Sequence, residues 1–142
     1  MYLTNHTLTG IAIGLSLDNP VAILPLAVAS HFYLDAIPHF GGPQFSFLKP
    51  LGRVIATIDC AIALSLAITS VIIWPERFGQ LTTAVFGATL PDLLFIPYYL
   101  MKIKFWEPLF RFHHVIQTER LWGAISEIAW ASLMLVVIGA YR

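Results

Sequence analysis

Charged residues are scarce in this chain. Only 11% of its 142 residues are Asp, Glu, Lys or Arg, whereas 58% are hydrophobic. A soluble domain carries about 25% charged residues, so these charges are too few to cover a water-exposed surface. The eight basic and eight acidic residues balance, and no basic run indicates a nucleic-acid partner. We therefore expect lipid around much of the protein.

Cysteine and the features of a signal peptide are also scarce. The single cysteine, Cys60, excludes an intrachain disulfide. A cleaved signal begins with a basic region, but no Lys or Arg precedes Lys49, and Asp18-Asn19-Pro20 interrupts the first apolar stretch. We expect that stretch to remain part of the folded protein.

Five apolar stretches predict an all-α integral membrane bundle that forms one domain over 1–142. A spanning helix needs about 20 apolar residues, and four stretches reach that length. The first is shorter, and it is a short span, a tilted half-helix or a re-entrant element. Their approximate limits are 3–17, 20–37, 51–74, 78–100 and 121–141, and a polar, aromatic stretch at 101–120 is expected to form an interfacial amphipathic helix.

Lys and Arg are unequally divided between the two sides of this bundle. If all five stretches cross the membrane, the N-terminus shares one side with the loops after the second and fourth stretches. Cytoplasmic loops carry an excess of Lys and Arg, so we assign that side to the cytoplasm. It holds Lys49, Arg53, Lys102, Lys104, Arg111 and Arg120, and the opposite side holds Arg77 and Arg142.

Histidines and carboxylates gather at similar depth near that same side. A buried carboxylate costs at least ~2.5 kcal/mol in a bilayer, so these groups need partners. A divalent cation would provide one, with zinc expected and manganese or magnesium as alternatives. The candidate metal ligands are His6, His31, Asp35, His39, Asp92, His113 and His114, and the candidate general bases are Asp59 and Glu127.

The spacing His31-x3-Asp35-x3-His39 in the second stretch places three ligands on one helix face. Pro38 disfavours helical geometry at Ile37. His39 is therefore expected beyond the helix end, and His31 with Asp35 is the safer pair.

Simpler roles exist for several candidates. Asp59 can pair with Arg53 or cap a neighbouring polar group, and the two adjacent histidines can face lipid headgroups. Pro91 should kink the fourth stretch and free the carbonyl of Gly87. Irregular backbone at membrane depth faces protein or a wet cavity, so Asp92 is expected to point inward.

The candidate residues occur in short motifs that resemble a known family. These motifs are Asn5-His6, the run from Ser30 to His39, Leu90-Pro91-Asp92 and His113-His114. They resemble the small membrane-bound metal-dependent hydrolases of the YdjM and YbcI type, and His-x3-Asp is also similar to the motifs of zinc-dependent phospholipase C. The resemblance implies a bacterial or archaeal inner-membrane protein with hydrolase activity.

Three functions fit these patterns. The first is a metal-dependent hydrolase that acts on a phospholipid or another phosphoester at the cytoplasmic face, where Lys102, Lys104 and Arg111 would hold an anionic headgroup. The second is a metal or proton transporter that uses the same groups as a relay. The third is a non-catalytic membrane module. Membrane lipid is the expected partner, and the oligomeric state stays open.

Overall fold

The chain folds into α-helices joined by short turns, which confirms the all-α prediction. The computed structural model describes residues 1–46, 48–101, 105 and 107–141, and within 95–101 it describes the backbone. The helices are α1 (Leu3–Ser16), α2 (Pro20–Ala36), α3 (Pro50–Ile73), α4 (Phe78–Met101), α5 (Glu107–Ile116) and α6 (Ala124–Gly139), with 3-10 turns at Pro43–Phe45, Pro75–Arg77 and Leu121–Gly123. Five helices therefore follow the five apolar stretches, and α5 lies in the stretch expected to be interfacial.

Helix α1 lies at the centre of the bundle. It packs against α2, α3, α4 and α6, and ten of its fourteen residues are buried. A helix of this length is about 21 Å long. Because four neighbouring helices shield it, α1 exposes little of its surface.

Two glycines let α1 approach α4 closely. A Cβ atom at Gly10 would lie 2.8 Å from the Cα atom of Val85, and one at Gly14 would lie 3.0 Å from the carbonyl oxygen of Gln80. Small residues spaced four apart permit this close backbone contact between apolar helices.

Many large hydrophobic side chains are exposed on this bundle, and many polar side chains are buried inside it. Within the described residues, α3 and the segment Leu121–Gly139 are each long and apolar enough to cross a membrane. Exposed large hydrophobic side chains include Ile58, Ile62, Leu64, Ile68 and Ile72 on α3 and Ile125, Ile128, Leu133, Leu135 and Val136 on α6. Buried polar side chains include Asn5, His6, Thr7, Thr9, His31, Asp35, Ser70, Thr89, His113 and Glu127.

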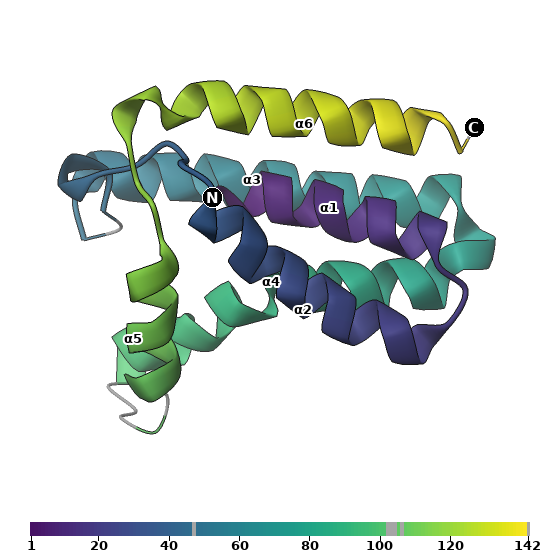
Figure 1. The fold of residues 1–142 in the computed structure, drawn as a ribbon, viewed down its shortest axis with the longest axis horizontal. Coiled ribbons are helices and arrows are strands. Elements are labelled where there is room, and N and C mark those ends of the chain that lie inside the picture. The colour runs from purple at the N-terminus through teal and green to yellow at the C-terminus, as the bar shows by residue number, and fades with distance from the viewer. Residues whose placement is uncertain (47, 102–104, 106, 142) are drawn as a thin grey trace.

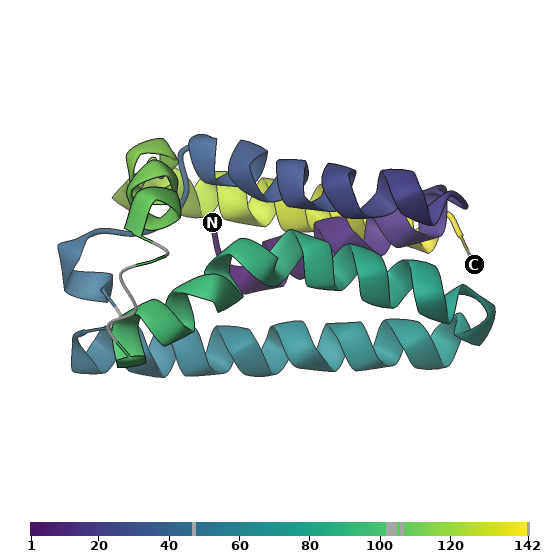
Figure 2. The same ribbon diagram turned by 90° about the horizontal axis from the view of Figure 1, so that it is seen from below.

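The long helices run alternately up and down, so one end of the bundle is chemically distinct. At that end α1, α3 and α6 begin and α2 and α4 finish, and α5 lies across it (Figures 1 and 2). A cluster of buried hydrophobic residues (Ile11, Leu15, Trp74 and Leu81) fills the opposite half. The arrangement agrees with the antiparallel order expected from the sequence.

Candidate metal centre

Helix α2 supplies two of the candidate ligands from one face. His31 and Asp35 are one turn apart, and Nε2 of His31 lies 3.2 Å from Oδ2 of Asp35. The helix ends at Ala36, and Ile37 is extended with φ −71° and ψ 136°. Pro38 accounts for this ending, because the residue before a proline is biased away from helical geometry.

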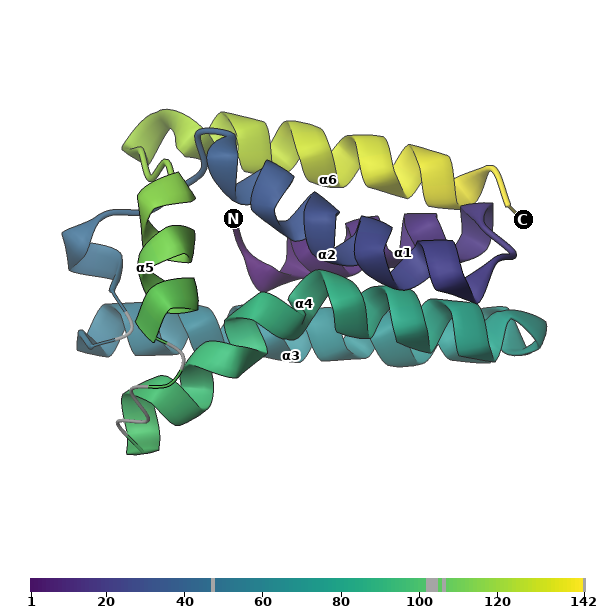
Figure 3. The ribbon, with the colours of Figure 1, turned by 60° about the horizontal axis from the view of Figure 1, so that its bottom comes forward.

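Helix α4 fixes the orientation and tautomer of His31. Nδ1 of His31 donates a hydrogen bond of 2.8 Å to the carbonyl oxygen of Ala88. Pro91, one turn later, has no N–H for a helical hydrogen bond, and α4 bends along its course (Figure 3). Because a carbonyl only accepts, Nδ1 carries the proton, and the neutral ring has a lone pair on Nε2.

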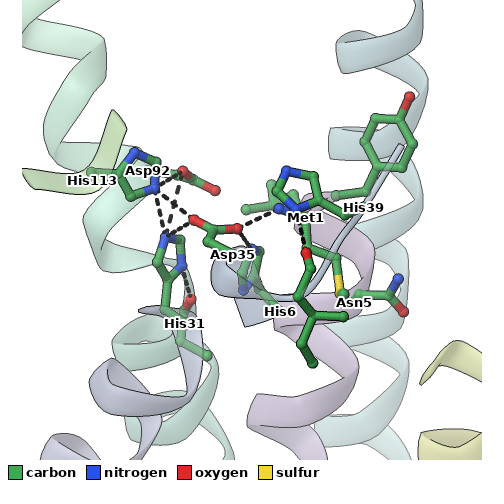
Figure 4. A network of polar contacts seen from close by, with 12 residues as sticks. Met1, Asn5, His6, His31, Asp35, His39, Asp92 and His113 are labelled. Atoms are coloured by element: carbon green, nitrogen blue, oxygen red, sulfur yellow. Dashed lines mark hydrogen bonds and ion pairs between the residues drawn. The ribbon is translucent and has the colours of Figure 1, made fainter. Parts of the chain in front are cut away.

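Donor atoms from three helices converge on that lone pair (Figure 4). Nε2 of His113, on α5, lies 3.0 Å from Nε2 of His31 and 2.7 Å from Oδ2 of Asp35. Oδ1 of Asp92, on α4, lies 3.7 Å from Nε2 of His31 and 3.5 Å from Nε2 of His113. One ligand atom from each of the four residues lies within 4.8 Å of the other three.

These separations match those of ligands around a small cation. Four ligands bound tetrahedrally at zinc–nitrogen and zinc–oxygen distances of about 2.0–2.1 Å are about 3.4 Å apart. Oδ2 of Asp35 is buried and accepts no hydrogen bond from any described residue, although two imidazole nitrogens lie close to it. A proton or a cation can lie between these groups, and two imidazole nitrogens with two carboxylates at these separations fit a metal ion.

The four residues differ in exposure. The side chains of His31 and Asp35 are fully buried, whereas that of Asp92 is 33% exposed. Asp92 is therefore the most exposed member of an otherwise buried group.

Helix α5 separates the two neighbouring histidines. His113 is buried in the group, whereas His114 is exposed and its ring stacks on that of Phe110 with centroids 6.0 Å apart. Backbone pairing after α5 holds this helix in place, because Thr118 N–H donates to the carbonyl of Asp35 and Arg120 N–H donates to that of His39. The structure thus brings one loop histidine to the group.

His39 lies beyond the end of α2, as its neighbouring proline predicts, and outside the group of four. Its Nδ1 donates a 2.9 Å hydrogen bond to the carbonyl oxygen of Ile37. Burial lowers the pKa of His39 below the ordinary histidine value. The ring lies beside the network of Figure 4 and does not join the metal-sized group.

His6 reaches Asp35 from the other side. Nε2 of His6 lies 3.2 Å from Oδ1 of Asp35, and the His6 ring stacks on that of His31 with centroids 4.0 Å apart. The α-amino group of Met1 also contacts Oδ1. The two oxygens of Asp35 thus face different partners.

Asp59 and Glu127 hold the start of α1. The N-cap residue of α1, Tyr2, makes no capping hydrogen bond with its side chain. Asp59, on α3, accepts hydrogen bonds from Leu3 N at 2.7 Å and Thr4 N at 3.0 Å. Glu127, on α6, accepts from Tyr2 N at 3.2 Å and from the Asn5 side chain.

These bonds give both carboxylates a structural role. Unpaired N–H groups and the positive end of the helix dipole favour an acid at a helix start. Here α3 supplies Asp59 and α6 supplies Glu127. These two carboxylates position α1 and therefore His6. The general-base role of Asp59 and Glu127 stays a prediction.

The expected headgroup cations are only partly described. Arg111 is exposed on α5, and its guanidinium pairs with Glu107 one turn earlier at 2.8 Å. Lys102 and Lys104 lie outside the described residues.

Sequence reasoning missed two features of this centre. The Ala88 carbonyl that orients His31 has no side-chain signature, although Pro91 nearby marks irregular backbone. The absence of Ser, Thr, Asp or Asn just before α1 was a usable signal that its cap comes from elsewhere. Comparison of the chain with family models, curated proteins and solved structures finds no match in any of the three.

Proposed function

We propose that this protein is an integral membrane, metal-dependent hydrolase that acts on a phosphoester of a lipid or a similar amphiphile. The observation that carries the proposal is the convergence of one ligand atom each from His31, Asp35, Asp92 and His113 within 4.8 Å. Three separate helices contribute to this group, and the bundle positions them.

The distribution of side chains supports membrane insertion. Exposed Ile, Leu and Val side chains cover α3 and α6, while imidazoles, carboxylates and hydroxyls lie inside. In water this arrangement would expose apolar surface far beyond what soluble monomers show. In lipid it buries each polar group within the protein, as the hydrocarbon phase requires. The excess of cations on the side of the metal centre favours a cytoplasmic orientation.

Two imidazoles and two carboxylates suit a catalytic cation. Such mixed nitrogen and oxygen ligands favour zinc, with manganese as the alternative. When bound, the ion would lower the pKa of a water ligand toward ~7 and polarise a phosphoryl oxygen. Asp35 and His31 would hold the ion from the dry side, and Asp92 lies where substrate can enter.

Helix α5 supports an amphiphilic substrate. It crosses the end of the bundle that holds the site (Figure 1), and it carries the exposed apolar side chains Phe112 and Val115 beside the exposed Arg111. An amphipathic helix of this kind lies at the boundary between headgroups and acyl chains. A lipid phosphate at this boundary would be close to the edge marked by Asp92.

Transport receives less support. A conduit needs polar groups in both halves of the bundle. The half opposite the metal centre is packed with Ile11, Leu15, Trp74 and Leu81, and these side chains offer no site for an ion. The remaining alternative, a non-catalytic module, predicts a bound metal without turnover.

The proposal is tested with protein purified in detergent from the membrane fraction. We expect stoichiometric metal by elemental analysis, and from mixed micelles the release of inorganic phosphate from phosphatidic acid or of a phosphorylated headgroup from a phospholipid. His31→Ala should lose both, while His114→Ala, which alters an exposed ring, should keep both. Protein that holds no metal, or metal retained by His31→Ala, would contradict the site. A metal-loaded protein with no turnover on any phosphoester would favour the non-catalytic module.

A further inference from the structure

The two oxygens of Asp35 point to two binding positions. Oδ2 faces the nitrogens of His31 and His113 at 3.2 and 2.7 Å, whereas Oδ1 faces Nε2 of His6 at 3.2 Å and contacts the α-amino group of Met1. We infer that His6 and Oδ1 of Asp35 hold a second cation, and that Asp35 bridges it to the first. This inference rests on the proposed metal centre and adds a second ion to it.

His6 has the character of an unused ligand. Its side chain is 0% exposed, Nδ1 has no hydrogen-bond partner among the described residues, and Nε2 faces Oδ1 of Asp35. A buried imidazole nitrogen that makes no hydrogen bond is unfavourable. Stacking on His31 fixes the ring plane, so Nε2 is held toward Asp35 (Figure 4). A cation at this nitrogen would compensate the cost.

Helices on several sides determine where this ring lies. His6 is on α1, and Asp59 and Glu127 anchor the first turn of that helix from α3 and α6. The anchored α1 therefore acts as the support for the second position. Two carboxylates from other helices hold the turn that carries this imidazole, which is easier to explain if the imidazole binds a ligand than if it only fills space.

A pair of cations specifies the substrate class further. In two-metal sites the ions lie about 3.5–4 Å apart and together hold the attacking and leaving oxygens of a phosphoryl group. The second position has two side-chain ligands, and the α-amino group of Met1, which contacts Oδ1, would give way to the cation. The remaining positions would be open to water or to phosphate oxygens. This favours a phosphoester over a carboxylic ester as the substrate.

A one-cation site offers a different explanation for His6. Its Nε2–H would then donate to Asp35 and orient that ligand, as carboxylate-bound histidines do around metals. The two explanations differ in how many ions bind, and this number is measurable without any substrate.

Manganese binding to the intact protein in detergent tests the inference. We expect two Mn²⁺ per chain and the electron paramagnetic resonance spectrum of a spin-coupled pair. His6→Ala and His6→Phe should each bind one Mn²⁺ with an uncoupled six-line signal; the Phe variant keeps a ring that can stack on His31 but has no nitrogen. A thermal unfolding curve shows that each variant is folded.

The possible outcomes separate the second position from the first. One Mn²⁺ per wild-type chain, unchanged in His6→Phe, would overturn the second position and leave the proposed function intact. Two coupled ions in both wild type and His6→Phe would also overturn it, because other ligands would then hold the second ion. No bound Mn²⁺ or Zn²⁺ in wild type would overturn both proposals.

Discussion

The Nε2 atoms of His31 and His113 lie 3.0 Å apart, although the residues are 82 positions apart in the sequence. His31 already donates its Nδ1 proton to Ala88, so its Nε2 faces His113 as an acceptor. Two imidazole nitrogens at this distance require either a shared proton or a cation between them. The proton or cation between these two nitrogens therefore links α5 to α2.

The neighbouring histidines of α5 form a matched pair for mutation. His113→Ala should weaken zinc binding by more than ~100-fold, because loss of an outer-shell partner alone costs 10–100-fold. His114→Ala should leave the affinity within about 2-fold of wild type, because its ring is exposed and packs on Phe110. Competition with a chromophoric zinc chelator measures both constants. Equal losses in the two variants would contradict the assignment of His113 as the ligand.

Metal binding should depend on pH in a defined direction. A proton shared by His31 and His113 must leave when the ion binds, since metal ligands are deprotonated. The apparent affinity should therefore fall as the pH is lowered, because protons then compete with the ion for the imidazole nitrogens. Titration calorimetry in buffers of different ionisation enthalpy counts the released protons, and no release at pH 6 would contradict the shared-proton account.

The acid that caps α1 should contribute to stability. Asp59→Ala removes the acceptor for Leu3 N and Thr4 N, so the free energy of unfolding should fall by about 1 kcal/mol, within the 0.5–2 kcal/mol range of helix caps. Asp18→Ala is the control, because Asp18 is an exposed residue paired with Arg77 and such pairs contribute about 0–1 kcal/mol. Unfolding in mixed micelles measures both, and an Asp59→Ala protein as stable as wild type would contradict the capping role.

The same substitution at two glycines tests the packing of α1. Gly10→Ala places a Cβ atom 2.8 Å from the Cα atom of Val85, so it should destabilise the bundle by about 1–3 kcal/mol. Gly139→Ala meets nothing within 4 Å and should be neutral or stabilising by up to about 1 kcal/mol. Thermal unfolding of the two variants is the comparison, and equal midpoints would argue against close contact between α1 and α4.

Local chemistry in the sequence predicts the helices and one ligand pair well. Pro20 and Pro38 bracket α2, which begins at Pro20 and ends at Ala36, and His-x3-Asp spacing places His31 beside Asp35. These features depend on the backbone rules of proline and on the helical repeat. The proline rules and the helical repeat act over a few residues, so they can be applied to a single sequence.

Long-range packing determined what the sequence could not predict. The shortness of the first apolar stretch left several placements open for α1. Its central position follows from its own Gly10 and Gly14 and from hydrogen-bond acceptors on α3 and α6. From the sequence alone, Asp59 can be a general base, an ion-pair partner or a helix cap. The structure places the start of α1 beside it, where it accepts a hydrogen bond from Leu3 N. The choice between His113 and His114 likewise depends on how α5 is rotated against the bundle.

X-ray absorption at the zinc edge of the purified, metal-loaded protein tests the central claim most directly. The four-residue group predicts nitrogen and oxygen ligands at about 2.0–2.1 Å, with the outer-shell scattering of at least two imidazoles, and loss of one imidazole in His113→Ala. A spectrum with sulfur ligands, or with water oxygens and no imidazole, would contradict a metal centre built from His31, Asp35, Asp92 and His113.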